Sequence, residues 1–577
     1  MLNTFQLLPL MGRQGMPPLL IDPAAQKLQA LYASTEWRKF ADRSAHETAS
    51  RVYAKCPPPQ RKLAGLEAAN YIEAIMPLTQ ADILEQHSGY GAVRWLWYLR
   101  RAPDSLFKGL YGTTLGYDSH LAELLSSQFM ASDVSHEAER VAFRVDDASF
   151  RHLVRYVGRV KLLSQLHVLY RRVGKGAILD ASHPILVSEA SEAVERAMRI
   201  YDARHDYSHE FIGAGLGLVS VAPDFEKLID ESAIGEPIAF LSLGCAPSFP
   251  APVTYPDGAG GLCVVTAQVR HVINELRLVR LLRPMGEEGG VPEYLSGIAA
   301  LIQLLVLVPA ICVHVPWAFC SIIQHGYVFV GEERLRDIFD HHLAEIVEQL
   351  APLTPGFAWP TNFIEWRESV LDVVPSVWPL SSGNVLRRFR DNFLIDTTSA
   401  SQALLHRLEL ARSPLTGNLR GREFELQCQD LIDGTPWAPP PEVKFFRGRR
   451  LRQGGVILTD IDAIGVKGRT LLIVSCKSII YGRDYDQGAF RVIRNIQDTV
   501  DNAVVTWERV VAQLRLQPAG ENFDFSQFDE IIGVVCTPFA AYSSEERTLA
   551  FVQPKLRANS SIRELRDWLA CSIATET

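Results

Sequence analysis

The sequence lacks a paired cysteine motif, although it contains nine cysteines among its 577 residues. None of them forms a Cys-x-x-Cys pair, and they are widely spaced along the chain. The cysteines therefore predict neither a zinc ribbon nor a disulfide framework, and they are typical of reduced core residues in a cytoplasmic protein. The first residues also lack the basic and apolar segments of a signal peptide, which leads to the same expectation.

An overall excess of positive charge is also absent. The formal net charge is -8, so any binding to nucleic acid must come from a local basic patch. The hydrophobic fraction of 47% and the charged fraction of 21% are ordinary for packed globular proteins and exclude a disordered chain. The length corresponds to roughly three or four domains.

One long segment has no charged residue at all. Between Tyr294 and Ile323 there is no Asp, Glu, Lys or Arg, and residues 298–315 are apolar enough to span a bilayer. Pro309 would break or kink a helix in the middle of that span. We therefore predict a buried helix up to about Val308, followed by a buried strand, and no membrane association. An anchor formed by residues 294–323 stays open as the alternative.

Residues 1–400 predict a mainly helical region for recognition or regulation, with a potential break between two subdomains near 205–260. His205 and His209 are one helical turn apart, a spacing that metal sites use, but we interpret them as a polar helix end. Residues 151–175 are strongly basic. We interpret them as a solvated face paired with acidic neighbours, and contact with nucleic-acid phosphates is the alternative.

Residues 401–420 are predicted to be a linker, and residues 421–577 a separate domain with alternating helices and strands. A helix opens at Gly421, and the predicted order from there is α-β-β-β-α-β. The strands are expected at 443–446, 456–466, 471–480 and 530–536, and the second helix at 492–514. The fold class is therefore α+β or α/β, with a mostly helical N-terminal region.

Asp462 in the second of these strands and Lys477 in the third form the candidate catalytic pair. Residues two apart on a strand share a face, which places Asp460 beside Asp462 and Ser475 beside Lys477. A lysine within the apolar strand 471–480 needs water or a carboxylate partner, and Asp462 is the natural one. Hydrolysis of a phosphodiester needs a divalent metal, and Mg²⁺ prefers carboxylate and water oxygens.

These residues, with Gly421-x-x-Phe424-Glu425 in the first helix and Ser475-Cys476-Lys477 in the third strand, resemble the PD-(D/E)XK, or restriction-endonuclease-like, nuclease superfamily. The resemblance implies a metal-dependent endonuclease that cleaves DNA with Mg²⁺ or Mn²⁺. It implies that Glu425, Asp460, Asp462 and the backbone carbonyl of Cys476 contact the metal. Such domains occur in bacterial defence systems and mobile elements, so other subunits of a defence or transposition complex are further expected partners.

The chain departs from the family at Ser475, where the pattern has a second metal-binding Asp or Glu. Another acid could replace it, or Glu425, Asp460 and Asp462 could hold one metal without it. Alternatively the domain is catalytically weak or inactive and serves as a module that binds DNA or a partner protein. The candidate replacement acids are Asp484, Asp486, Asp498 and Asp501.

The densest basic cluster of the chain directly precedes Asp462 and contains two phenylalanines. Cations interleaved with aromatic rings suit phosphate contacts and base stacking, so we predict that this cluster binds nucleic acid. Gln497 and Asn495, on the helix after the third strand, could add polar contacts to the site or to DNA. The predicted cations are Lys444, Arg447, Arg449, Arg450 and Arg452.

Overall fold

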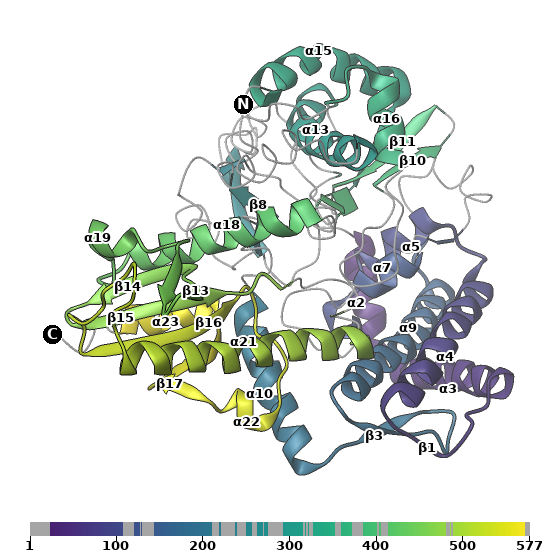
Figure 1. Cartoon of the computed structure of the whole chain (residues 1–577). Helices are drawn as coiled ribbons and strands as arrows, with labels where there is room; N and C mark the ends of the chain where they lie inside the picture. Colours follow the sequence, from purple (N-terminus) through teal and green to yellow (C-terminus); the bar gives the residue numbers. More distant parts are fainter. Residues whose placement is uncertain are drawn as a thin grey trace.

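The computed structural model describes residues 23–571 with gaps. Its described part is a mixed α and β structure with several small sheets (Figure 1). The residues outside it are 1–22, 108–119, 127, 130–142, 210–217, 221–236, 239–249, 257–261, 269–270, 275–291, 316–317, 319–320, 322–326, 352–358, 372–384, 390, 398, 401–402, 405–413, 480–484, 486–487 and 572–577.

The N-terminal part is a helical bundle around the long helix α9 (Asp147–Gly174). Asp146 and Ser149 cap the start of α9 reciprocally, which satisfies backbone N–H groups that the helix leaves unpaired. Gly158 lets α9 approach α3 closely, because a Cβ atom there would meet the Ala41 backbone. Other elements of this part are α2 (Pro23–Ser34), α3 (Trp37–Lys55), α4 (Gly65–His87), α5 (Ala92–Leu99), α6 (Asp104–Phe107), α7 (His120–Ser126), β1 (Lys62–Leu63), β2 (Ile178–Asp180) and β3 (Val187–Glu189).

The uncharged segment forms the helix α13 (Pro292–His314). The helix continues through Pro309, so the predicted strand after Val308 is wrong. It packs against α15 (Glu332–Leu350) and α16 (Phe363–Leu371), and nearly all of its described apolar side chains are buried. Across the described part of the chain, no helix is long and apolar enough to cross a membrane.

Hydrogen bonds tie α13 to the chain around it. The Gln303 side chain donates to the Pro360 carbonyl at 3.1 Å, and the Trp366 indole donates to the Ala300 carbonyl at 3.1 Å.

An antiparallel sheet lies in the same part, with the order β10 (Leu386–Phe389), β11 (Asn392–Asp396) and β9 (Tyr327–Gly331). Shorter strands are β4 (Leu218–Ser220), β5 (Pro237–Ile238), β6 (Pro250–Pro256), β7 (Leu262–Gln268) and β8 (His271–Asn274).

A four-stranded sheet organises the C-terminal part. Its order is β14 (Ala463–Lys467), β15 (Thr470–Cys476), β16 (Glu530–Thr537) and β19 (Asn559–Ser561). β14 and β15 are antiparallel, whereas β15, β16 and β19 are parallel. The strand predicted at 530–536 is confirmed, whereas the strand predicted at 471–480 ends at Cys476, so Lys477 directly follows it and does not lie within it.

Helices cover both faces of this sheet (Figure 1). α18 (Pro414–Asp433) and α23 (Ile562–Cys571) pack on one face, and α21 (Phe490–Leu516) packs on the other. The predicted helix at 492–514 is confirmed as α21, whereas α18 begins seven residues before the predicted start at Gly421. Small elements at the sheet's far end are α22 (Glu545–Thr548), β17 (Phe551–Gln553) and β18 (Leu556–Arg557).

Two of the predicted strands differ from the structure. Residues 443–446 are not a strand, because Pro440 and Pro441 begin the short helix α19 (Pro441–Lys444), where the fixed φ of proline is favourable. The strand predicted at 456–466 is interrupted at Ile461 and Asp462, which separate β13 (Val456–Asp460) from β14. β13 pairs instead with β12 (Arg450–Gln453) in a hairpin, which turns at Gly454 and Gly455, both with positive φ.

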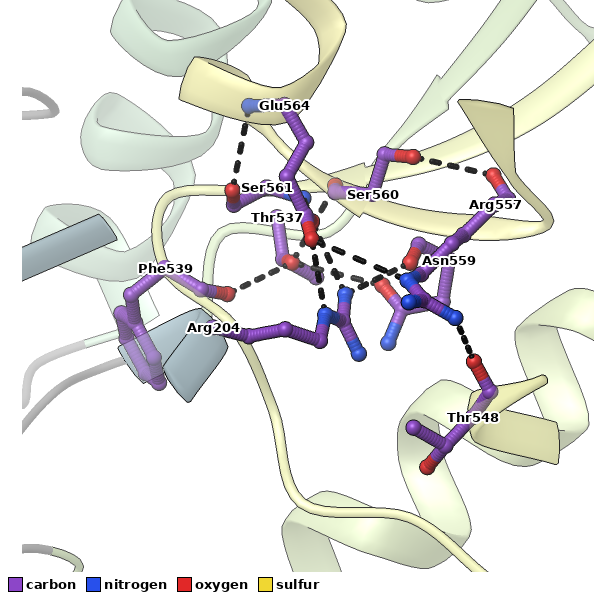
Figure 2. A network of polar contacts seen from close by, with 9 residues as sticks. All are labelled: Arg204, Thr537, Phe539, Thr548, Arg557, Asn559, Ser560, Ser561 and Glu564. Carbon is purple, nitrogen blue, oxygen red and sulfur yellow. Dashed lines mark hydrogen bonds and ion pairs between the residues drawn. The ribbon is translucent and has the colours of Figure 1, made fainter. Parts of the chain in front are cut away.

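Helix α10 (Glu192–His209) joins the N-terminal part to the C-terminal sheet, as Figure 2 shows. The Arg204 guanidinium forms two bonds with the Glu564 carboxylate, at 2.8 and 2.9 Å, and donates to the Asn559 carbonyl at 2.8 Å. Both side chains of this ion pair are largely buried. Tyr201 packs edge-on against Tyr542 in the same joint. The sheet therefore buries side chains from a helix more than 200 residues upstream of α18.

The remaining N-terminal features have structural roles. His205 is buried and stacks on Tyr201, while the side chain of His209 lies outside the described residues. Arg172 pairs with Glu195, and Lys175 pairs with Asp202. These pairs favour the interpretation of residues 151–175 as a basic face satisfied by acidic neighbours.

The joint at α10 generates a stability prediction. Arg204→Ala leaves the buried Glu564 carboxylate without its bidentate partner, and breaking a buried pair in this way costs about 3 kcal/mol. Arg196→Ala is the matched control on the same helix, because it removes two more exposed ion pairs, with Glu192 and Glu545, and is expected to cost less than about 1 kcal/mol. Urea unfolding followed by circular dichroism measures the loss in free energy of unfolding for both variants. Equal losses would show that the Arg204–Glu564 ion pair is no more important for stability than the exposed pairs of Arg196.

A buried histidine in the bundle predicts a pH dependence. Burial, with His152 and Arg159 nearby, lowers the pKa of His87 to about 2, and Arg159 donates to its Nε2 atom at 2.6 Å. The unfolded chain therefore binds an extra proton below the ordinary pKa of 6.5, and stability falls as the pH drops. We expect a loss of about 2 kcal/mol from His87 between pH 7 and pH 5.

The measurement is the unfolding midpoint at both pH values for the wild type and His87→Gln. The substitution should reduce the loss at pH 5, whereas His183→Gln, at an exposed position, should leave it unchanged. An undiminished loss in His87→Gln would show that this histidine is not the cause.

Candidate active site

Asp462 lies at the break between β13 and β14 and is held by backbone bonds on three sides. Its own N–H donates to the Val474 carbonyl at 3.2 Å, and its carbonyl accepts from Arg447 Nε at 3.1 Å. The Cys476 N–H donates to its carboxylate at 2.6 Å. The carboxylate is thereby fixed at the end of β15, next to Lys477, whose N–H donates to the Cys536 carbonyl at 2.8 Å.

Charged groups from three elements converge here. Burial raises the pKa of Glu425 on α18, and the charges of Asp462 and Asp460 raise it further, while Arg447 and Lys477 lower it. Burial also raises the pKa of Asp462, which the Cys476 N–H and Lys477 partly offset. The charges of Asp460 and Lys477 therefore act on the carboxylates of both Glu425 and Asp462.

The structure gives Ser475 a different task from metal binding. Its side chain hydrogen-bonds with Asp462 and thereby lowers the pKa of that carboxylate. Among the candidate replacement acids, Asp501 accepts a hydrogen bond from the Ser543 hydroxyl at 2.5 Å and from Gln497, and Asp498 is exposed. Asp484 and Asp486 lie outside the described residues.

The donor set suits a metal only in part. Within the described ranges, no three His, Cys, Asp or Glu side chains are arranged to hold a metal ion. Mg²⁺, however, commonly uses one or two carboxylates and keeps several waters. Asp462 and Glu425 are acidic groups whose mutual repulsion a divalent cation would relieve. Asp462 and Glu425 would supply two of the oxygen ligands that Mg²⁺ or Mn²⁺ takes, and water would have to supply the others.

Three buried thiols line the side of the sheet that faces α18. Cys428 on α18 donates to the Cys536 sulfur on β16 at 3.7 Å, and Cys476 hydrogen-bonds with Cys428. Burial raises the pKa of all three thiols, which keeps them neutral. They are free, as the spacing of the cysteines predicted, but their gathering beside Asp462 was not foreseen because they are far apart in sequence.

The cations of the predicted basic cluster have different contacts in the structure. Lys444 pairs with Asp433, and Arg447 points to Asp462. The Arg449 guanidinium stacks over the exposed Phe445 ring, 3.2 Å from its centre. Arg450 and Arg452 alternate with buried residues on β12, so both face solvent. Gln497 accepts a hydrogen bond from Arg494 at 3.4 Å.

Comparison of the chain with protein-family models, curated proteins and solved structures finds no significant match. The arrangement of Glu425, Asp460, Asp462, Lys477 and Arg447 is therefore the basis for the assignment of function. The resemblance to the nuclease superfamily stays a prediction.

The raised pKa of Glu425 predicts a substitution that stabilises the fold. The carboxylate ionises less readily in the folded chain, so its charge disfavours folding above the folded pKa, and this effect disappears as the pH falls below the ordinary value of 4.5. Glu425→Gln should raise stability at pH 7 without metal by roughly 0.5–1 kcal/mol. Glu442→Gln, at an exposed position, is the control. A drop in the unfolding midpoint of Glu425→Gln would overturn this assignment.

Proposed function

We propose that the C-terminal part of the chain is a metal-dependent nuclease domain of the PD-(D/E)XK type that hydrolyses phosphodiester bonds in DNA. The observation that carries the proposal is the convergence of Glu425, Asp460 and Asp462 with Lys477 at one end of β15. Carboxylates that bind a metal, next to a lysine that stabilises charge, are the groups that this reaction needs.

The element order supports the proposal. α18 precedes the strands β12 to β15, and α21 then crosses over to the parallel strand β16. The two helices are thus separated by four strands, one more than the resemblance implies, and the second helix is followed by a further strand as the resemblance implies. The acidic residues lie on α18 and at the break before β14, and the lysine follows β15, as expected for this superfamily.

In the proposed reaction, Asp462 and Glu425 would hold Mg²⁺ or Mn²⁺, together with the backbone carbonyl of Cys476. The bound metal would neutralise charge on the scissile phosphate and activate water. The Cys476 N–H and the Ser475 side chain keep the Asp462 carboxylate in a fixed orientation. Lys477 contributes a positive charge near the phosphate, where negative charge develops in the transition state.

The hairpin before the site is the proposed DNA contact. Arg450 and Arg452 present two exposed cations on one face of β12, and Arg449 and Phe445 add a stacked cation and an exposed ring. Cations bind the phosphate backbone, and exposed rings stack on bases. A cytoplasmic role in bacterial defence or in a mobile element, with further protein subunits as partners, is part of the same proposal.

A second candidate function is a nuclease-like module that binds DNA or a protein without cleaving it. Two observations favour it. Ser475 replaces a carboxylate and bonds to Asp462, and within the described residues no three donor side chains form a complete metal site. In this case the basic hairpin would still bind DNA, whereas Asp462 and Lys477 would have no catalytic role.

The experiment is a cleavage assay with purified protein, Mg²⁺ or Mn²⁺, and duplex DNA, single-stranded DNA and RNA. We expect metal-dependent cleavage of DNA that falls by about 100- to 1,000-fold in Asp462→Asn and in Lys477→Met. Glu442→Gln is the control for an exposed acidic residue outside the proposed catalytic residues. Cleavage that survives both site substitutions would disprove the site.

DNA binding by the wild type and by an arginine variant of the hairpin tests the second candidate function, the binding module. If no substrate is cleaved, but DNA binding measured by fluorescence anisotropy is weakened about tenfold in Arg449→Ala together with Arg450→Ala, the binding module is correct.

A further inference from the structure

Arg447 occupies a different place from the other arginines of the basic hairpin. It pairs with Ile461 in an isolated bridge, and the next residue, Gly448, donates to the Ile461 carbonyl at 2.7 Å. Its side chain then reaches the Asp462 carbonyl through Nε at 3.1 Å. The guanidinium is therefore half-buried beside the carboxylates rather than on the solvent face of β12.

The two terminal nitrogens of Arg447 remain available. In the described part of the chain, neither Nη1 nor Nη2 forms a hydrogen bond or an ion pair with a protein atom. Other oriented arginines here differ: Arg51 binds Asp82, and Arg204 binds Glu564, through Nε and Nη2 together. Arg447 is oriented by a neutral carbonyl, which leaves its charge and its pair of donors for another acceptor.

The charge of the site identifies the acceptor. Glu425, Asp460 and Asp462 together with Lys477 and Arg447 leave a single negative charge when all are ionised. A divalent metal would change this to a single positive charge, which one phosphodiester group would neutralise. The planar guanidinium fork matches two phosphate oxygens with parallel hydrogen bonds, whereas a lysine offers only a point charge.

We propose that Arg447 binds the phosphate group at the metal site through Nη1 and Nη2, while its Nε bond to the Asp462 carbonyl fixes the distance between that phosphate and the Asp462 carboxylate. This inference rests on the proposed function and deepens it. The acceptor is a phosphodiester in a nucleic acid, and inorganic phosphate shares its chemistry. Arg447 thus acts at the reacting group, while Arg449, Arg450 and Arg452 act along the backbone.

The first test uses the full chain with Mg²⁺ and inorganic phosphate as the probe, against sodium chloride at equal ionic strength. Millimolar phosphate should raise the melting temperature of the wild type and of Arg449→Gln by about 2–4 °C. In Arg447→Lys and Arg447→Gln this rise should fall to less than half. Equal melting temperatures of all variants in chloride show that each is folded.

The inference is overturned if Arg447→Lys keeps the full rise, if Arg449→Gln loses it as well, or if the wild type shows none. The second test is DNA cleavage, in which Arg447→Lys should lower kcat/KM about 100-fold through misplacement of the phosphate. Arg449→Gln should mainly raise KM. If the wild type cleaves no substrate, the proposed function fails, but the phosphate measurement still decides the role of Arg447.

Discussion

The interruption of the chain at Ile461 and Asp462 is the constraint on which the candidate site depends. On one side of the break, β13 pairs with β12 in the hairpin, and on the other, β14 pairs with β15 in the main sheet. A continuous strand would turn successive side chains to alternate faces. The break instead gives Asp462 three separate anchors, to Val474, Arg447 and Cys476, which bring the hairpin and the sheet together at one carboxylate.

The site holds its charges at a cost in folding free energy. Burial raises the pKa of both Glu425 and Asp462, and the thiols of Cys428, Cys476 and Cys536 exclude water from the face behind them. A core that kept these positions apolar would avoid the unfavourable desolvation of carboxylates. Clusters of ionisable groups with shifted pKa values are typical of functional sites.

The elements with strong local patterns were predicted from the sequence. α21 has a regular apolar stripe, and β15 and β16 are nearly continuous apolar runs, so periodicity alone indicates each of them. Glu425, Asp460, Asp462 and Lys477 were predicted as one site because their elements follow in a recognisable order. The break at Asp462 was missed, since the residues around it continue an alternating strand pattern. The start of α19 was also missed, although its prolines carried the signal.

Contacts between distant segments could not be predicted, and they determine how the sheet is supported. Arg204 and Glu564 are 360 residues apart, and each looks locally like an ordinary charge on a helix. Likewise the Tyr542 hydroxyl donates to the Lys175 carbonyl, and Gly488 lies so close to the Arg171 backbone that a larger residue would collide with it. These contacts attach α10 to the edge of the sheet and the start of α21 to α9. Residues of α10 therefore share a core cluster with Ile493 on α21 and with Phe539 and Tyr542, which follow β16, so a change in α10 also acts on elements that support the sheet.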